Sequence, residues 1–397
     1  MNKDFFTRNR MKLRAAVDAD VIILAGNVSV QRSNDASFGF EQESNFWYLC
    51  GIDFPNWQLI METGKSLLVA PDVEEIHRIF DGSLTNEDAM RISGADEVIS
   101  TETADALILN MQKEGKSVAT IGEDTHKEYY DFVLNPGPVD LFEKIRSIFS
   151  SVEDCRKTLS TLRAIKQPEE IAAIRGAIEL TIEGFDNVKK RIDEYKFEYE
   201  IEADLTHYFR KNGAAGHAYD PIIASGKNAC TLHYGKNQDE LSNDAFVLLD
   251  VGARHSGYAA DITRTYAYGN VSDRQRALHM AVEKAHKEII SLLKPGLKVE
   301  VYHKAVDEIM KHALRDLGLL NSPSDYRKYF PHSVSHGLGI DVHDSLGGPV
   351  AFLPGMVLTV EPGIYIPEEA IGVRIEDDIL ITETGNENLS AALPTSM

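Results

Sequence analysis

Four acidic residues in the second half of this 397-residue chain occupy positions where a carboxylate is poorly tolerated. Asp250 and Asp261 lie in the stretch FVLLDVGARHSGYAADITRTY, and Glu361 and Glu376 lie in VLTVEPGIYIPEEAIGVRIEDDILIT. Both stretches are otherwise rich in Val, Ile, Leu, Ala and Tyr, so we expect the acids to be at least partly buried. Because buried carboxylates need a compensating positive charge, bound metal is the simplest explanation.

Each stretch is predicted to fold as a β-hairpin that pairs its two acids. A turn at residues 255–256 would place the two aspartates directly opposite each other, and a turn at residues 368–369 would do the same for the two glutamates. Directly opposed residues in an antiparallel pair have Cβ atoms about 4.5–5.5 Å apart, and like charges placed there are destabilising. The pairing therefore strengthens the expectation of a cation between the acids.

A histidine-rich run, PHSVSHGLGIDVHD at residues 331–344, lies between the two hairpins. One of its histidines together with the four carboxylates would give five ligands. Sites dominated by oxygen favour Mn, Mg or Ca, whereas an imidazole shifts the preference towards a transition metal. Four carboxylates are more than one small ion needs, so we expect two ions that share bridging acids. Two ions about 3.5–4 Å apart can hold and deprotonate a water, which is hydrolytic chemistry.

The elements that carry these residues are predicted to occur twice along residues 168–397. Proline at position 168 and the two acids after it suit the first turn of a helix. Ser272 and Gln275 suit a capping box at the start of another helix. The first pass comprises helices at about 168–193 and 198–212 and the hairpin at 245–268, and the second comprises a helix from 272, a helix at 299–317 and the hairpin at 356–382. Such a duplication would bring the two hairpins together about a pseudo-two-fold axis.

Residues 1–150 are predicted to form a smaller α/β domain, and residues 151–167 a linker. The predicted strands are short apolar runs at residues 21–25, 46–50, 57–61, 66–70 and 118–121. Residues 62–65 are predicted to form a hairpin turn and residues 135–138 a loop. The predicted fold class is therefore α+β, with an internally repeated C-terminal domain behind a small N-terminal one.

Composition limits the classes of partner. The net charge of −21 argues against nucleic acid and against an anionic membrane surface. No stretch approaches the roughly 20 apolar residues of a membrane span, and the charged N-terminus does not resemble a signal peptide. The three cysteines are scattered and odd in number, which suits a reducing compartment. We therefore expect a cytoplasmic protein.

Five ordered motifs give the chain a family resemblance. LLDVGA, ADITRT, HGLGIDVHD, TVEPGIY and RIEDD resemble the pita-bread dinuclear metallopeptidases, and most of all their proline-specific branch, aminopeptidase P and prolidase. The motifs cover about residues 168–397. The segment RSNDASFGFEQESNFWYLCGID also resembles the N-terminal domain of aminopeptidase P. The resemblance implies the pita-bread (creatinase/aminopeptidase) fold for the catalytic domain and a creatinase-type fold for the N-terminal domain.

The resemblance also implies a ligand set, namely Asp250, Asp261, His336, Glu361 and Glu376. Asp261 and Glu376 would bridge the two ions, and Glu361 would also act as general acid and base. Two divalent ions are implied, with Mn²⁺ expected because most donors are hard oxygens, and Co²⁺ or Zn²⁺ as alternatives.

Further residues receive roles from the same resemblance. His233 would approach the substrate backbone and its tetrahedral intermediate, His343 would bind the scissile carbonyl, and His332 would line the pocket for the proline ring. Arg374 would pair with nearby acids or with a substrate carboxylate.

Simpler interpretations exist for each of these residues taken alone. Asp250 could be a turn former, Glu361 a surface acid, His336 a loop histidine and Arg374 a surface partner of neighbouring acids. His233 and the tyrosine after it could be a packing pair. The coincidence of two acidic pairs with a histidine cluster between them favours the ligand interpretation.

The predicted function is a metal-dependent Xaa-Pro aminopeptidase that uses a metal-bridged water to release the N-terminal residue of proline-containing peptides. An Xaa-Pro bond has no N–H to donate, so its pocket needs an apolar surface for the ring and donors for the carbonyl. The alternative is an Xaa-Pro dipeptidase, because Gly39, Glu41 and Glu43 depart from the aminopeptidase P pattern. Methionine aminopeptidase, a metal-free creatinase-like hydrolase and a non-catalytic binding module rank lower. The resemblance further implies a homodimer or homotetramer.

Overall fold

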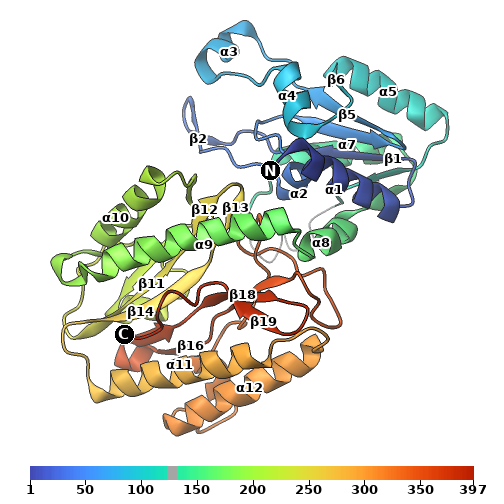
Figure 1. The fold of residues 1–397 in the computed structure, drawn as a ribbon. Helices are drawn as coiled ribbons and strands as arrows, with labels where there is room; N and C mark the ends of the chain where they lie inside the picture. Colours follow the sequence, from blue (N-terminus) through green and yellow to red (C-terminus); the bar gives the residue numbers. More distant parts are fainter. Residues whose placement is uncertain (123–131) are drawn as a thin grey trace. The chain divides into compact units, whose positions relative to one another are not determined.

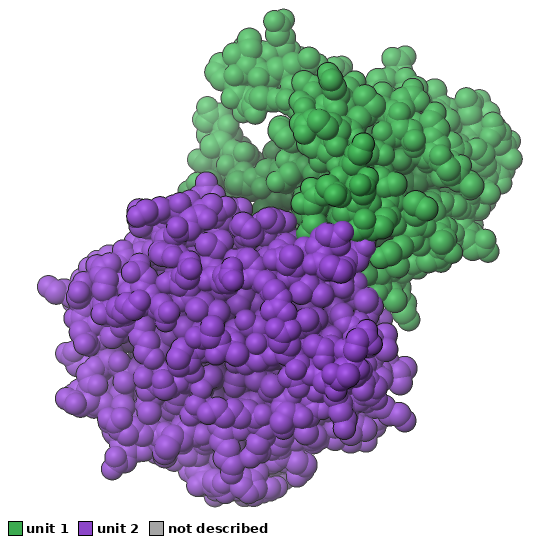
Figure 2. Space-filling view, in the orientation of Figure 1, with its two compact units in different colours: residues 1–162 green, residues 163–397 purple. Residues whose placement is uncertain are grey.

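The computed structural model describes residues 1–122 and 132–397, which form two compact units. Unit 1 comprises residues 1–162 and unit 2 comprises residues 163–397 (Figure 2). The predicted linker region, residues 151–167, contains strand β8 (Val152–Asp154) and all of helix α8 (Arg156–Ala164). In the described part of the chain, no helix has both the length and the apolar character needed to cross a membrane.

Unit 1 is built on a six-stranded sheet with the order β6-β5-β4-β1-β7-β8, in which β4 runs antiparallel to its neighbours. Helices α5 and α7 bury their apolar side chains against this sheet. The other strands are β1 (Val21–Ala25), β4 (Gln58–Glu62), β5 (Lys65–Ala70), β6 (Glu97–Ser100) and β7 (Val118–Thr120), beside a small hairpin of β2 (Gln31–Ser33) and β3 (Ala36–Ser37). The helices are α1 (Lys3–Ala16), α2 (Ser44–Cys50), α3 (Glu75–Asp81), α4 (Asn86–Ser93), α5 (Thr101–Lys113) and α7 (Pro136–Ile148).

Two sequence predictions for unit 1 are wrong. Residues 46–50 form helix α2 rather than a strand, because the Glu43 carboxylate caps the Phe46 amide and Gly51 ends the helix in the left-handed region at φ 68°. A short apolar run cannot be assigned by periodicity alone. Residues 135–138 begin helix α7 rather than forming a loop, because Asn135 accepts a hydrogen bond from Gly137 as N-cap and Pro136 takes the first helical position. The predicted turn at residues 62–65 is confirmed, since Glu62 pairs with Lys65.

Unit 2 shows the predicted repetition of two helices and a hairpin. Figure 1 shows strands β11, β14, β16 and β18 running between the helix pair α9 and α10 and the helix pair α11 and α12. The helices are α9 (Pro168–Lys189), α10 (Glu198–Lys211), α11 (Asp273–Leu292), α12 (Val299–Asp316) and α13 (Asp325–Tyr329). The strands are β9 (Gly216–His217), β10 (Ile222–Ser225), β11 (Ala245–Val251), β12 (Ala253–His255), β13 (Tyr258–Ala259), β14 (Ile262–Tyr268), β15 (Val357–Val360), β16 (Gly363–Ile366), β17 (Ile371–Arg374), β18 (Asp377–Ile381) and β19 (Asn386–Asn388).

The predicted helix starts in unit 2 are confirmed. Pro168 is the first residue of α9, and the Glu170 carboxylate accepts the amide of Gln167 at 2.9 Å. Ser272 and Gln275 form the expected reciprocal capping box of α11. Helices α11 and α12 bury an apolar stripe against the second hairpin, and this packing forms the main core of the unit.

The first hairpin differs from its predicted register. Strands β11 and β14 pair Asp250 with Thr263, so the two aspartates are not directly opposed. The turn lies at Ser256 and Gly257, which both have positive φ, as a two-residue type I′ turn requires. Because this turn is centred one residue later than predicted, every pairing partner shifts by two positions.

The second hairpin keeps its predicted register. β15 pairs with β18 and β16 pairs with β17 about the same centre, and Val360 faces Asp377. Glu361 and Glu376 therefore occupy corresponding positions at the break between these two ladders. The two hairpins also meet each other, because Thr263 forms an isolated β-bridge with Glu376. Asp250 therefore faces Thr263, and Thr263 faces Glu376. Because Glu361 corresponds to Glu376, three acids lie at matching positions on neighbouring strands.

Candidate metal centre

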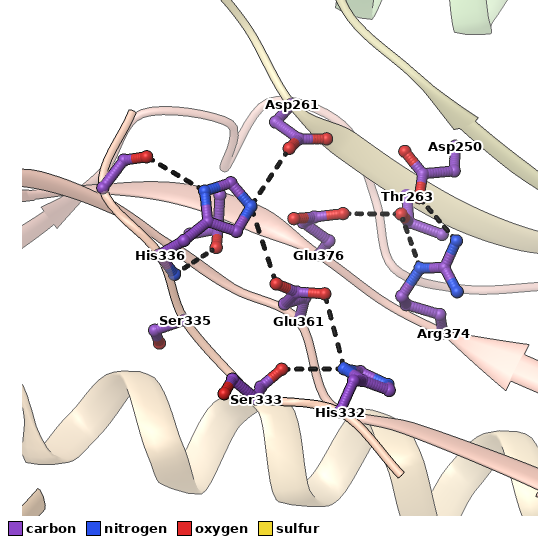
Figure 3. Close-up of polar contacts among 12 residues, drawn as sticks. Asp250, Asp261, Thr263, His332, Ser333, Ser335, His336, Glu361, Arg374 and Glu376 are labelled. Carbon is purple, nitrogen blue, oxygen red and sulfur yellow. Dashed lines mark hydrogen bonds and ion pairs between the residues drawn. The ribbon is translucent and has the colours of Figure 1, made fainter. Parts of the chain in front are cut away.

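The five side chains predicted to bind metal converge in unit 2 (Figure 3). Three overlapping groups have potential donor atoms within 4.8 Å of one another: Asp261 with His336 and His343, His336 with Glu361 and Glu376, and Asp250 with Asp261 and Glu376. The fit of metal to these groups rests on the chemistry of the donors.

The acids of the first hairpin share one hydroxyl. The Tyr219 oxygen lies 2.6 Å from Oδ1 of Asp250 and 2.6 Å from Oδ1 of Asp261. A hydroxyl has one proton, so it can donate to only one of these carboxylates at a time. The second carboxylate therefore lacks a donor from Tyr219, and this part of the site holds more negative charge than the tyrosine can compensate.

The acids of the second hairpin have different partners. Thr263 Oγ1 donates to Oε2 of Glu376 at 2.6 Å. Glu361 lies between two imidazoles, with Oε1 3.6 Å from Nε2 of His336 and Oε2 3.6 Å from Nδ1 of His332. The side chain of Glu376 is buried, with 2% of its surface exposed.

His336 is oriented as a ligand would be. Its Nδ1 lies 2.9 Å from the carbonyl oxygen of Gly337, so Nδ1–H donates to the backbone and Nε2 faces Asp261 at 3.3 Å. Histidines that bind metal commonly donate their other N–H to a carbonyl in this way. The backbone of His336 is held to Thr359 of β15 by hydrogen bonds in both directions.

The ionisation of these groups reflects the crowding of acids. Burial raises the pKa of Glu376 well above its usual range, and the charges of Asp261 and Glu361 raise it further. Burial likewise raises the pKa of Glu361 to about 7. Burial lowers the pKa of His336, but the hydrogen bond and charge of Asp261 outweigh this effect and raise it to about 9. The protein alone can thus hold the cluster only by retaining protons that divalent cations would replace, so the donor set fits a metal site.

A polar chain connects the two hairpins along one wall of the site. Arg374 donates through Nη2 to Oδ2 of Asp250 and through Nη1 to the Tyr365 hydroxyl at 2.8 Å. That hydroxyl lies 2.9 Å from Nε2 of His332. Burial and the charge of Arg374 lower the pKa of His332 to about 4, so this imidazole is neutral.

The loop that carries His336 and His343 is fixed by buried ion pairs. The His343 ring packs edge-to-face on His336 with centroids 4.3 Å apart. Asp344 accepts from Arg163 at 2.9 Å and lies 3.4 Å from Nζ of Lys166. His233 is exposed and lies near enough to His332 and His343 to add to the lowering of their pKa values, which burial chiefly causes. All of the predicted site residues therefore gather around one centre.

Sequence reasoning missed three hydroxyl groups at the site. Thr263 could have been found, because Asp261, Thr263 and Thr265 alternate along a buried strand and so point to one face. Tyr219 precedes β10 in an irregular segment without periodicity, and Tyr365 resembles any aromatic residue of a buried strand. Neither tyrosine carries a local signal of its role.

Comparison with known proteins identifies the family. Residues 172–383 match the model of metallopeptidase family M24, and residues 6–120 match that of the aminopeptidase P N-terminal domain. The chain belongs to metallopeptidase family M24. The Xaa-Pro aminopeptidase of Haemophilus influenzae is 34% identical over an alignment covering 99% of this chain and 95% of the relative. The Xaa-Pro aminopeptidase of Escherichia coli is 31% identical, with 98% and 95% covered.

Solved structures support the same M24 assignment. Aminopeptidase P from Escherichia coli with the inhibitor Pro-Leu has a TM-score of 0.86 at 30% identity, covering all of this chain and 96% of that one. The Zn-substituted form of the same enzyme, in complex with product, has a TM-score of 0.83 at 30% identity over the same shares of the two chains. The predicted pita-bread fold behind a smaller N-terminal domain is confirmed, and so is the prediction of a metallopeptidase that uses divalent metal.

Proposed function

We propose that this M24 enzyme is an Xaa-Pro aminopeptidase, which releases the N-terminal residue from peptides with proline in the second position. The observation that carries the proposal is the cluster of four carboxylates and His336, with His332, His343 and His233 beside it. The relatives named for this activity align along nearly the whole chain, including unit 1.

The ligand set supports two divalent ions. Asp250 would hold one ion, His336 and Glu361 the other, and Asp261 and Glu376 would bridge both. When bound, such a pair of ions lowers the pKa of a water to make the nucleophile and stabilises the oxyanion of the transition state. Carboxylate oxygens dominate the donor set, which favours Mn²⁺, while Co²⁺ and Zn²⁺ also suit carboxylate and imidazole donors.

Glu361 is proposed to carry the proton. Its carboxylate can take a proton from water and deliver it to the nitrogen of the leaving proline. The water oxygen bonds to the carbonyl carbon to give a tetrahedral intermediate, and the C–N bond then breaks as the proline nitrogen takes up the proton. The products are the free residue and a peptide that begins with proline. His332 is neutral and packs edge-to-face on Phe330 at 5.1 Å, which suits it to the wall of a pocket for an apolar ring.

The remaining histidines receive substrate-binding roles, and Arg374 receives a positioning role. His343 is proposed to donate to the scissile carbonyl, and His233 to contact the substrate backbone and the tetrahedral intermediate. Arg374 is proposed to act chiefly by holding Asp250, because its guanidinium is already engaged with that carboxylate and with Tyr365.

A homodimer or homotetramer in the cytoplasm is also proposed. Helix α3 of unit 1 exposes Ile79 by 72% and Phe80 by 78%, which is a large apolar surface for a helix of seven residues. The three cysteines are free, which suits a reducing compartment. Light scattering of the purified protein would test the assembly, and a monomer at micromolar concentration would contradict it.

The decisive experiment compares hydrolysis of Ala-Pro and Ala-Pro-Ala by the protein loaded with Mn²⁺. Release of alanine from the tripeptide supports the aminopeptidase, whereas cleavage of only the dipeptide would make the enzyme a dipeptidase. Ala-Ala-Ala serves as the matched control substrate and should not be cleaved. Metal analysis should find more than one equivalent of tightly bound ion, and a smaller amount without Mn²⁺-stimulated hydrolysis would refute the proposal.

A further inference from the structure

Behind the metal cluster, Arg264 of β14 is a buried guanidinium with all five donors engaged. Nη1 donates to the carbonyl oxygens of Thr263 at 2.9 Å and Glu376 at 2.7 Å. Nη2 donates to Oδ1 of Asp377 and to the carbonyl oxygen of Leu393, each at 2.7 Å, and Nε donates to the carbonyl oxygen of Pro394 at 3.1 Å. Arg264 is 1% exposed, so each of these bonds replaces one that water would otherwise make.

Two of these contacts reach the backbone of site residues. The Thr263 carbonyl accepts from Arg264 and also from the Glu376 amide at 3.1 Å, while the Thr263 hydroxyl holds the Glu376 carboxylate. Arg264 therefore links the backbones of the two hairpins at Glu376, which is one of the two ligands proposed to bridge the ions.

Two further contacts, to the carbonyl oxygens of Leu393 and Pro394, reach residues 386–394, which we name the brace segment. This segment grips the residues after Glu376: Asn388 donates to Oδ2 of Asp377 at 2.6 Å, Ser390 Oγ accepts from the amide of Asp378, and the Leu389 amide donates to the Asp378 carbonyl. The match to the M24 family ends at residue 383, so the brace segment lies beyond it.

We propose that Arg264 and the brace segment form a positioning device that holds Glu376 in the geometry needed to bind metal. The five donors of one rigid, planar group tie the ligand strand, its facing strand and the brace segment together. This inference rests on the proposed two-metal site, and it predicts that metal affinity depends on residues that touch no metal. Outer-shell partners typically change metal affinity about 10–100-fold.

The test compares Arg264→Lys with Arg10→Lys. Arg10 is a matched control, because it is also a buried arginine that donates to backbone carbonyls, those of Leu49, Ser93 and Gly94, but it lies in unit 1. Titration calorimetry of the metal-free full chain with Mn²⁺ should show a dissociation constant raised about 10-fold or more for Arg264→Lys. For Arg10→Lys the dissociation constant should stay within about 2-fold of the parent even if its melting temperature falls, because no hydrogen bond of Arg10 reaches the site. Equal metal affinity in all three proteins would overturn the proposal.

A second readout does not depend on metal. Amide hydrogen exchange at residues 374–378 should accelerate in Arg264→Lys and in a variant that lacks residues 393–397, and should be unchanged in Arg10→Lys. The deletion removes two acceptors of Arg264 and leaves the arginine in place, so it remains informative if Arg264→Lys does not fold. Unchanged exchange in these residues would overturn the brace. A parent protein that bound no divalent ion would instead refute the proposed function and leave exchange to decide the brace.

Discussion

The two hairpins of unit 2 carry the same kind of acidic pair but compensate its charge differently. In the first hairpin, Tyr219 shares one proton between Asp250 and Asp261, and Arg374 supplies the positive charge. In the second hairpin, Glu361 faces two histidines and Glu376 accepts from the Thr263 hydroxyl. Asp250 is therefore held by a fixed cation, whereas Glu361 lies between two imidazoles that can gain or lose protons. One of these imidazoles, that of His336, also faces Asp261.

The partners are also exchanged between the hairpins. Arg374 belongs to the second hairpin and holds Asp250 of the first, whereas Thr263 belongs to the first and holds Glu376 of the second. Asp378 of the second hairpin likewise accepts the amide of Asp261 at 3.2 Å. Neither hairpin completes its half of the site alone, so the duplicated halves are interdependent. Substitutions on opposite sides of this exchange should therefore have different consequences.

The largest effect is expected for Glu361→Gln, compared with Asp250→Asn. Glutamine retains the size of Glu361 but cannot accept a proton, so kcat should fall by about 10²–10⁴-fold while the protein stays folded. Asp250→Asn should chiefly weaken metal binding, because Asp250 has no proton-transfer role in the proposed mechanism. Steady-state kinetics with Ala-Pro-Ala at saturating Mn²⁺ distinguishes the two. Near-normal turnover by Glu361→Gln would remove the difference proposed between the pairs.

Arg374→Met should destabilise the metal-free protein much more than the metal-loaded one. The substitution leaves Asp250 buried without its cation, and breaking a buried ion pair typically costs about 3–5 kcal/mol. Bound metal supplies positive charge to the same carboxylate, so urea unfolding should show a larger gap between EDTA and Mn²⁺ conditions than in the parent. Thr263→Val serves as the control, because it removes the hydrogen bonds of the Thr263 hydroxyl, including the one from Arg374 Nε at 3.3 Å, but leaves the Arg374 charge beside Asp250. An unchanged gap in Arg374→Met would show that Arg374 does not compensate Asp250.

Tyr219→Phe is expected to weaken Mn²⁺ binding more than Thr263→Val. Tyr219 contacts two proposed ligands and Thr263 Oγ1 contacts one, and each such outer-shell partner typically affects metal affinity about 10–100-fold. Calorimetric titration of the two variants gives the order directly. The reverse order would indicate that the hydrogen bond from Thr263 to Glu376 matters more for Mn²⁺ affinity than the hydrogen bonds of Tyr219.

The same two hairpins show how far the sequence reaches. The second hairpin could be placed in register from its acids, because the same centre relates both of its ladders. The register of the first hairpin could not be predicted, because it depends on Ser256 and Gly257 adopting positive φ. A turn centred one residue earlier shifts every pairing by two positions and keeps the same side chains on each face of the strands. The apolar pattern therefore does not distinguish the two registers. The motifs around the proposed ligands pointed to one centre despite this error. Tyr219 and the brace segment depend on long-range contacts, which leave no local pattern in the chain.

The smallest effect expected concerns the groups that back each hairpin from its covering helix. Glu170 of α9 accepts from the Tyr258 hydroxyl of β13 at 2.9 Å, and His286 of α11 lies 3.4 Å from Asp377 of β18. Burial raises the pKa of Glu170 and lowers that of His286 to about 4. The charges near His286 are Asp377, Arg264, Lys287 and Glu283, and they do not offset its burial.

The raised pKa of Glu170 and the lowered pKa of His286 make stability depend on pH in opposite directions. Native Glu170 holds its proton more tightly than the unfolded chain, so its contribution is lost as pH rises from about 4.5 through the raised pKa. Native His286 holds its proton less tightly, so its contribution is present above the unfolded value of about 6.5 and is lost as pH falls through 4. We therefore expect urea unfolding between pH 4 and 8 to show that the free energy of unfolding of His286→Gln falls less steeply than that of the parent as the pH is lowered. For Glu170→Gln, the free energy of unfolding should decline less than that of the parent as the pH is raised. If both variants retained the parent's dependence of the unfolding free energy on pH, Glu170 and His286 would not support the two hairpins in different ways.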